Sequence, residues 1–234
     1  MATQEKLITK MFNYPYRHII WDWNGTLLDD SRMAVMVINK TLAKRDMPTI
    51  SLEHYQKIFG FPVIDYYRRL GFDFKDESFE VVGTEFIDGY EKHKYDVGLH
   101  PGVEEVLSKL SSLRVSHSIL SAYKQNTLDE LVEHFGLTNR FMKIVGLDNH
   151  YAHSKVDNGI QWMSELGMEP SEVLFVGDTE HDFEVAEAIG VDCILIPGGH
   201  QTREALENTG TTILDRIADL LLLTAKLAEN AKVI

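Results

Sequence analysis

The chain has 234 residues, of which 44% are hydrophobic, and a formal net charge of −13 at pH 7. This length allows a sizeable buried core, in one large domain or in one domain that carries a modest second one. The acidic balance argues against nucleic acid or an anionic membrane as the main partner, because either would need a basic face. A small anionic substrate is compatible with it, since a bound metal ion reverses the local field inside a cleft.

The expected location is the cytoplasm. The sequence shows no apolar stretch of about 18 residues that would span a membrane and no signal-peptide pattern. Cys193 is the only cysteine, so no intramolecular disulfide can form, which suits a reducing compartment. The sequence leaves the oligomeric state open.

The first predicted element is a strand over residues 18–21, a short and partly β-branched run typical of a strand buried on both faces. The turn sequence Asn24-Gly25-Thr26 follows it. This pattern predicts a strand that ends abruptly and places polar residues just beyond its carboxyl end.

Residues 31–95 differ in pattern, and we expect them to form a separate all-helical cap domain. Apolar residues at Met33, Val37 and Leu42 keep helical spacing, with Ser31 as the N-cap. Further helices are predicted over residues 52–59, 63–70 and 79–90, and no strand is predicted here. The rest of the chain, residues 1–30 and 96–234, would then form one core domain.

After residue 102, helices and strands alternate. This alternation indicates an α/β fold with a doubly wound parallel sheet and right-handed crossovers. Such sheets bind ligands just beyond the carboxyl ends of their strands. Helices are predicted over residues 103–113, 127–135, 156–166 and 182–189, strands over 115–120, 142–147, 173–176 and 193–196, and a last helix over 216–227.

Polar residues stand at the ends of four predicted strands. Asp22 ends the first strand and Ser121 the second, Lys155 opens the helix after the third, and the run from Gly177 to Asp182 follows the fourth. Because the carboxyl ends of parallel strands meet at one edge, we expect these side chains to converge there. Carboxylates, a hydroxyl and an ammonium group at one place suit phosphoryl transfer.

The expected chemistry depends on two carboxylates. Asp22 and Asp178 would hold Mg²⁺, which prefers oxygen ligands and usually takes one or two carboxylates. A carboxylate can also attack phosphorus, so Asp22 would form an aspartyl-phosphate that water then cleaves. Ser121, Lys155 and backbone N–H groups after Asp22 would hold the phosphate oxygens.

The order of these motifs resembles the haloacid dehalogenase superfamily. The motifs are Asp-x-x-Gly-Thr-Leu-x-Asp from Asp22 to Asp29, Ser121, Lys155, and Gly-Asp-x-x-x-Asp from Gly177 to Asp182. The helical insert looks like the C1 cap of that superfamily. The layout is similar to phosphoglycolate phosphatase and β-phosphoglucomutase-like members, and the resemblance covers residues 17–200.

The resemblance implies a Mg²⁺-dependent phosphatase that hydrolyses a small phosphorylated metabolite. It makes Asp22 the nucleophile and a metal ligand, Asp178 a ligand, and Asp182 a ligand or an orienting residue. The residue two positions after the nucleophile gives its backbone carbonyl to the metal, a role that Asn24 can fill. The implied phosphate and substrate contacts are Gly25, Thr26, Gly60, Ser121, Ala122 and Lys155.

Asn24 departs from the pattern of phosphatases in this superfamily. They carry an Asp there that protonates the leaving group and then deprotonates the attacking water, whereas Asn has no titratable proton. General acid–base help is worth about 10²–10⁴-fold in rate. We therefore expect Asn24→Asp to raise turnover of substrates with poor leaving groups, on the order of 10²-fold.

Two other interpretations stay open. A phosphonoacetaldehyde hydrolase is similar in Asp-Trp-x-Gly-Thr and lacks the second Asp, but it needs a cap lysine for a Schiff base. The other interpretation is a protein that binds Mg²⁺ and phosphate without useful turnover. The candidates for a Schiff base are Lys40, Lys44 and Lys57, and Lys124 and Lys143 are alternatives to Lys155 as the site lysine.

Overall fold

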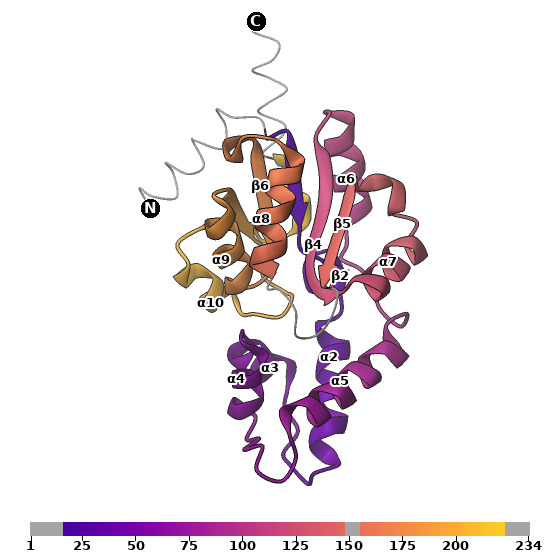
Figure 1. Ribbon diagram of the computed structural model, residues 1–234, viewed down its shortest axis with the longest axis vertical. Coiled ribbons are helices and arrows are strands. Elements are labelled where there is room, and N and C mark those ends of the chain that lie inside the picture. Colours follow the sequence, from indigo (N-terminus) through magenta and orange to yellow (C-terminus); the bar gives the residue numbers. More distant parts are fainter. Residues whose placement is uncertain (1–15, 148–154, 223–234) are drawn as a thin grey trace, which may run out of the picture.

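The computed structural model describes residues 16–147 and 155–222. Figure 1 shows an α/β core and, on one side of it, a helical cap built from a single inserted segment. The cap lies at the edge of the core where the strands of the main sheet end. Within the described ranges, no helix has the length and apolar character needed to cross a membrane.

The core is a six-stranded sheet in the order β5-β4-β1-β6-β7-β8, and every neighbouring pair is parallel. The order reverses direction at β1, which has β4 on one side and β6 on the other. The predicted doubly wound parallel sheet is therefore confirmed. The strands are β1 (His18–Trp21), β4 (Ser116–Lys124), β5 (Lys143–Leu147), β6 (Val173–Gly177), β7 (Asp192–Leu195) and β8 (Thr212–Ile213).

Helices cover both faces of this sheet, so its strands are apolar on both sides. Along β1, Ile19 and Trp21 pack against one cluster of buried residues, whereas Ile20 packs into another on the opposite face. The first cluster includes residues of α6 and α7, and the second includes residues of α8, α9 and α10. These helices are α6 (Val103–Ser112), α7 (Gln125–His134), α8 (Lys155–Leu166), α9 (Glu180–Ile189) and α10 (Arg203–Asn208).

The cap has four helices: α2 (Ser31–Ala43), α3 (Leu52–Ile58), α4 (Val63–Arg69) and α5 (Phe79–His93). Their buried side chains form a separate aromatic-rich cluster that includes Tyr55, Tyr66 and Tyr67. All of residues 31–95 are described, and none of them lies in a strand, so the predicted all-helical insert is confirmed.

The chain passes between core and cap at two short strands. β2 (Leu28–Asp29) pairs antiparallel with β3 (Gly98–Leu99) in a separate two-stranded sheet. This pairing brings the start and the end of the inserted segment together. The division of the chain at residues 30/31 and 95/96 stays our prediction for the domain boundary.

Several elements differ from the prediction. β4 runs on past Ser121 to Lys124, with an irregular register after Leu120, so Ser121 lies within the strand and not at its end. The paired two-residue strands β2 and β3, the edge strand β8 and the helix α10 were not predicted. The last predicted helix, 216–227, begins with a 3-10 turn, Ile217–Asp219, and its residues 223–227 lie outside the described part. Two further 3-10 turns are Thr138–Arg140 and Pro170–Glu172.

Candidate active site

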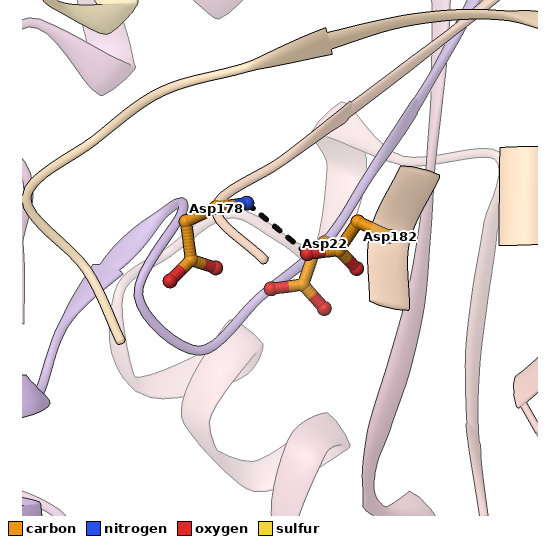
Figure 2. Close-up of side chains that lie close together, drawn as sticks. All are labelled: Asp22, Asp178 and Asp182. Carbon is orange, nitrogen blue, oxygen red and sulfur yellow. Dashed lines mark hydrogen bonds between the residues drawn. The ribbon is translucent and has the colours of Figure 1, made fainter. Parts of the chain in front are cut away.

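Three buried carboxylates meet at the carboxyl end of the sheet (Figure 2). Asp22 follows β1, Asp178 follows β6, and Asp182 lies in the first turn of α9. The parallel register pairs Trp21 with Val176, so the two residues that come next, Asp22 and Gly177, continue side by side. One oxygen of each carboxylate lies within 4.8 Å of the others, a spacing at which all three could bind one cation.

The loop between β6 and α9 is held by Asp182. Its Oδ2 accepts hydrogen bonds from the backbone N–H groups of Asp178 (3.1 Å) and Thr179 (2.9 Å) and from the Thr179 hydroxyl (2.7 Å). Thr179 in turn caps the helix, forming a capping box with Asp182. Gly177 has no side chain because a Cβ there would come within 2.4 Å of the Asp182 side chain.

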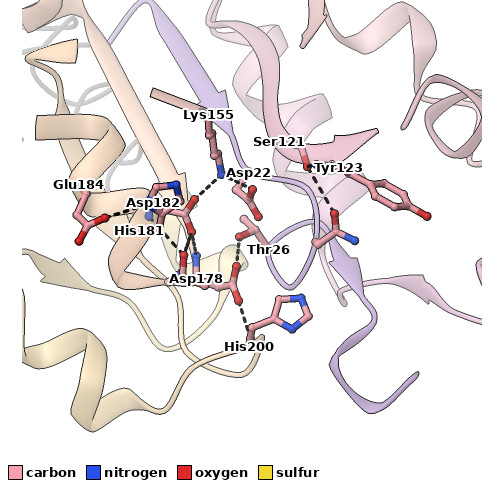
Figure 3. A network of polar contacts seen from close by, with 12 residues as sticks. Asp22, Thr26, Ser121, Tyr123, Lys155, Asp178, His181, Asp182, Glu184 and His200 are labelled. Atoms are coloured by element: carbon pink, nitrogen blue, oxygen red, sulfur yellow. Dashed lines mark hydrogen bonds and ion pairs between the residues drawn. The ribbon is translucent and has the colours of Figure 1, made fainter. Parts of the chain in front are cut away.

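Lys155 bridges two of the carboxylates (Figure 3). Its Nζ lies 2.5 Å from Asp22 Oδ1 and 2.5 Å from Asp182 Oδ1, and all three side chains are buried. Of the two other candidate lysines, Lys143 pairs with Glu165 and Lys124 is exposed. Lys155 is therefore the lysine that the structure brings to Asp22.

Three buried carboxylates and one buried ammonium group give the site an excess of negative charge when all of them are ionised. Burial raises the pKa of Asp22 to about 6, although Lys155 opposes the shift. Burial also raises the pKa of Asp178 to about 8, with His200 opposing and the other carboxylates reinforcing the shift. Burial alone would raise the pKa of Asp182 too, but the charge of Lys155 holds it below its usual value. A divalent cation with a preference for oxygen ligands would relieve this excess, so the donor set fits Mg²⁺.

The loop after β1 packs directly against Asp178. Gly25 has φ +78°, and a Cβ there would lie 2.3 Å from Asp178 Oδ2. The Gly25 N–H donates to the Leu28 carbonyl (2.9 Å) and to Asp30 Oδ1 (2.8 Å). The Thr26 hydroxyl donates to Asp178 Oδ1 (3.0 Å). Both residues, expected from the sequence to contact phosphate, thus form hydrogen bonds within the protein that hold the loop and Asp178.

The Asn24 side chain has polar contacts on both sides. Its Nδ2 donates to Asp30 Oδ2 (3.0 Å) and to the Tyr90 hydroxyl (2.8 Å), and its Oδ1 lies 3.5 Å from the Ser121 hydroxyl oxygen. Ser121 is buried, and its oxygen accepts the Tyr123 N–H (3.1 Å). Asn24, in the loop after β1, and Ser121, in β4, are thus brought together.

Two residues of the site, Asp30 and His200, were missed by the sequence analysis. The His200 N–H donates to Asp178 Oδ2 (2.6 Å), and its ring Nε2 lies 3.3 Å from Asp30 Oδ1. Burial alone would lower the pKa of His200, but the neighbouring Asp30 raises it to about 9. The available signal was Gly198-Gly199-His200 just beyond the fifth predicted strand, which follows the same strand-end rule as the other four.

The loop that carries His200 also contacts the cap. The Tyr55 hydroxyl lies 2.8 Å from His200 Nδ1, and Gln56 Nε2 donates to the Gly199 carbonyl (2.8 Å). Gln201 Nε2 donates to the Phe59 carbonyl (3.1 Å). These bonds fix helix α3 to the loop after β7, next to the carboxylates.

Gly60 and Ala122, two other residues expected near substrate, lie at the border of the site. A Cβ on Gly60 would be 3.8 Å from Gln201 Nε2, which places Gly60 at the contact between cap and core. Beside it, the ring of Phe61 stacks on His181 with centroids 4.5 Å apart. Ala122 is half-buried in β4, beside Ser121.

Comparisons with known proteins agree with this geometry. Two curated relatives are the phosphoglycolate phosphatase of Pseudomonas syringae pv. tomato, 28% identical over 213 residues (87% of this chain, 78% of the relative), and the tyrosine-protein kinase PtkA of Mycobacterium tuberculosis, 25% identical over 204 residues (86% and 69%). A solved structure of a predicted phosphoglycolate phosphatase from Haemophilus somnus is similar in fold, with a TM-score of 0.74 at 20% identity over 89% of this chain and 98% of that one. The solved structure of PtkA gives a TM-score of 0.75 at 25% identity over 88% and 96%.

The profile of the haloacid dehalogenase-like hydrolases matches residues 19–196, a span that contains the helical cap and all the carboxylates described above. The chain therefore belongs to the haloacid dehalogenase-like hydrolase family.

Proposed function

We propose that the protein is a Mg²⁺-dependent phosphatase that hydrolyses a small phosphorylated metabolite through an aspartyl-phosphate, an acyl phosphate formed on Asp22. The observation that carries this proposal is the buried group of Asp22, Asp178 and Asp182 with Lys155 bonded to two of them. A carboxylate nucleophile, a cation site and a fixed ammonium group are the parts that phosphoryl transfer requires.

We assign the Mg²⁺ ligands to Asp22, Asp178 and the backbone carbonyl of Asn24. Asp182 is the most heavily bonded of the three carboxylates: it accepts from Lys155 and from three donors in the loop after β6, whereas Asp178 accepts from two donors, Thr26 and His200. Its role in this proposal is to orient Lys155 and the loop. When bound, Mg²⁺ would neutralise charge on the phosphate and on Asp22.

Asp22 is assigned as the nucleophile, with Lys155 as its partner. The Lys155 ammonium keeps the Asp22 carboxylate ionised and oriented, and it would also neutralise a phosphate oxygen. Because Gly25 and Thr26 already form internal bonds, we assign the remaining phosphate contacts to the Ser121 hydroxyl and the backbone at Ala122.

The substrate would lie between the core and the cap, against Gly60 and Phe61. The similarity to phosphoglycolate phosphatases makes small phosphorylated carboxylic acids the first compounds to test. The net charge of −13 supports a metabolite and not nucleic acid as the partner, and we place this reaction in the cytoplasm.

No contact in the described part of the chain favours the Schiff-base alternative. Lys40, Lys44 and Lys57 are exposed on the cap, where they contact His93, Glu85 and Glu53. A Schiff-base lysine needs a lowered pKa, which a buried or apolar setting would supply. The geometry around Asp22 thus favours hydrolysis of a phosphate ester or anhydride.

The proposal is tested by assaying phosphate release from a panel of phosphorylated metabolites with Mg²⁺ and with excess chelator. We expect release from at least one small phosphorylated acid or acyl phosphate, and loss of that release when Mg²⁺ is removed. Release that persists without any divalent metal, or no release from the whole panel, would contradict the proposal.

A further inference from the structure

Asn24, two positions after the nucleophile, is held by hydrogen bonds and has an amide side chain that cannot act as a general acid or base. Asn24 donates both to Asp30 and to Tyr90, and its remaining oxygen faces the Ser121 hydroxyl. An amide has no titratable proton, so Asn24 can orient a water molecule but cannot accept a proton from it. Hydrolysis of a phosphorylated Asp22 therefore lacks a general base at this position.

Asp30, the carboxylate next to Asn24, is not free to replace it. Asp30 is 1% exposed, and each of its oxygens already has two partners. Oδ1 contacts the Gly25 N–H (2.8 Å) and His200 Nε2 (3.3 Å), and Oδ2 accepts from Asn24 Nδ2 (3.0 Å) and the Tyr90 hydroxyl. A carboxylate offers about four lone-pair sites, so none remains for a water molecule.

His200 is engaged in the same way. One ring nitrogen contacts Asp30, and the other lies 2.8 Å from the Tyr55 hydroxyl of the cap. Neither ring nitrogen is therefore directed toward a phosphate on Asp22. Among the described residues, the polar groups around Asn24 form a closed set of hydrogen bonds in which no base is available.

Asn24 and Asp30 also form a matched donor–acceptor pair. An Asp at position 24 would place two carboxylates at the distance now occupied by the 3.0 Å hydrogen bond, which would force one of them to take up a proton. The Asp30 carboxylate can therefore stay ionised beside an amide at position 24 but not beside a second ionised carboxylate. This pairing changes our expectation for Asn24→Asp, because that variant alone would disturb Asp30 as well as add a base.

We propose that Asp22-phosphate forms readily and is hydrolysed slowly, so that the phosphorylated protein is the state that accumulates during turnover. This inference rests on the proposed function, in which Asp22 attacks phosphorus. When the donor has a good leaving group, the lack of a general base slows the second step, hydrolysis of Asp22-phosphate, and not the first step, its formation.

The two steps differ in their need for a base. In the first, an Asp22 oxygen bonds to phosphorus and the donor's P–O bond breaks; an acyl phosphate leaves as a carboxylate and needs no proton. In the second, water bonds to phosphorus, the bond from Asp22 to phosphorus breaks, and the water must lose a proton to solvent. Lack of a general base slows only this second step, by about 10²–10⁴-fold.

The test uses the full chain with Mg²⁺ and acetyl phosphate labelled in its phosphoryl group. We expect a rapid burst of acetate close to one per chain, followed by a slower steady rate, and acid-quenched protein that carries the label. Asp22→Asn should remove both the burst and the label. A labelled intermediate at low occupancy with no burst would overturn this inference while leaving the proposed function intact.

The exchanged pair Asn24→Asp with Asp30→Asn supplies a matched comparison, because it keeps one amide and one carboxylate in contact. We expect the labelled protein to lose phosphate on the order of 10²-fold faster in this double variant. A small external base, imidazole, should also speed the decay in the unaltered chain, which requires no variant to fold.

Two results distinguish failure of this inference from failure of the proposed function on which it rests. Decay of the labelled wild-type chain that is as fast as its formation, or that responds neither to imidazole nor to the exchanged pair, contradicts slow hydrolysis. No label and no phosphate release with any donor contradicts the proposed function itself, and the inference fails with it.

Discussion

The contact between Lys155 and its two carboxylates is the strongest electrostatic feature of the site. Lys155 is 4% exposed and lies 2.5 Å from oxygens of both Asp22 and Asp182. Breaking a buried ion pair from one side leaves an uncompensated charge, which costs far more than the loss of an exposed pair. The lysine is thus expected to contribute both to stability and to the chemistry of Asp22.

Replacement of Lys155 by Met should lower the free energy of unfolding by about 3–5 kcal/mol and abolish phosphate release. Lys143→Met is the matched control, because Lys143 forms an exposed pair with Glu165 and its loss should cost about 0–1 kcal/mol. Urea unfolding measured by circular dichroism gives both values. Equal losses in the two variants would show that the buried pair is not the stabilising one.

The raised pKa values of Asp22 and Asp178 predict how stability depends on pH and Mg²⁺. Between the ordinary pKa of a carboxyl, 3.8, and its folded value of about 8, Asp178 holds a proton that the unfolded chain has released. The free energy of unfolding of the metal-free protein should therefore fall as the pH rises across this interval. His200 acts in the same direction, since its stabilising charge is lost as the pH rises through about 9.

Mg²⁺ should relieve this cost, because it binds the ionised carboxylates. The rise in Tm on adding Mg²⁺ is expected to be small near about pH 5 and to grow toward about pH 8. Asp178→Asn should reduce the rise at high pH. A rise that is the same at both pH values would mean that the cation does not bind at these carboxylates.

At the residue scale, the sequence was sufficient to predict those site residues whose positions depend only on the end of a strand or the start of a helix. Asp22, Lys155 and Asp178 each stand next to a predictable strand or helix boundary, and the parallel sheet brings those boundaries to one edge. Ser121 was predicted at a strand end but lies within β4. Asp30 follows the two-residue strand β2, which gives no sequence pattern, and lies at the end of no strand of the main sheet. Its role depends on the closure of the loop after β1 around the Gly25 N–H, which is a tertiary contact without a periodic signal.

At the scale of elements, the loop after β7 and helix α3 link core and cap beside the site. Tyr55 contacts His200, and Gln56 and Gln201 each donate to a backbone carbonyl on the opposite part. Because His200 also donates its N–H to Asp178, this link connects the position of the cap with that of a proposed metal ligand.

Tyr55→Phe should destabilise the protein by about 1–2 kcal/mol, since it leaves a buried nitrogen of His200 without a partner. Tyr66→Phe is a close control, because the buried Tyr66 hydroxyl forms no hydrogen bond with any described residue. Thermal unfolding of the two variants under the same conditions measures the difference. A cost for Tyr66→Phe as large as that for Tyr55→Phe would contradict this link.

Element boundaries were predicted less well than element types. The long apolar runs identified β1, β6 and β7, because buried parallel strands have no polar face. No sequence pattern indicated that β4 continues through Ser121 to Lys124, since the irregular register there is set by its pairing with β5. The two-residue strands β2 and β3 are too short to produce any pattern.

At the scale of the whole molecule, the division into a sheet and a helical insert follows from a change of period along the chain. Helical spacing without strands over residues 31–95 and strand–helix alternation after it were sufficient to predict both parts. The placement of the cap on the core could not be predicted in the same way. It depends on single hydrogen bonds such as that between Tyr90 and Asp30, which join distant segments.

Two helices of the cap contact residues of the site through tyrosine hydroxyl groups. Tyr55 of α3 contacts His200, and Tyr90 of α5 contacts both Asn24 and Asp30. Two contacts from different helices restrain the cap more than one would, and both end on residues that surround the Gly25 turn. The cap and the loop after β1 therefore form one connected polar network beside the proposed nucleophile.

The central claim, that Asp22 attacks phosphorus, is tested most directly by comparing Asp22→Asn with Asp76→Asn in an assay of Mg²⁺-dependent phosphate release. Both variants make the same chemical change, but Asp22 is buried beside Lys155, whereas Asp76 is exposed on the cap. An amide is neither a nucleophile toward phosphorus nor an anionic ligand, so Asp22→Asn should lose all release while Asp76→Asn keeps the wild-type rate. Turnover retained by folded Asp22→Asn would show that another group attacks the phosphate.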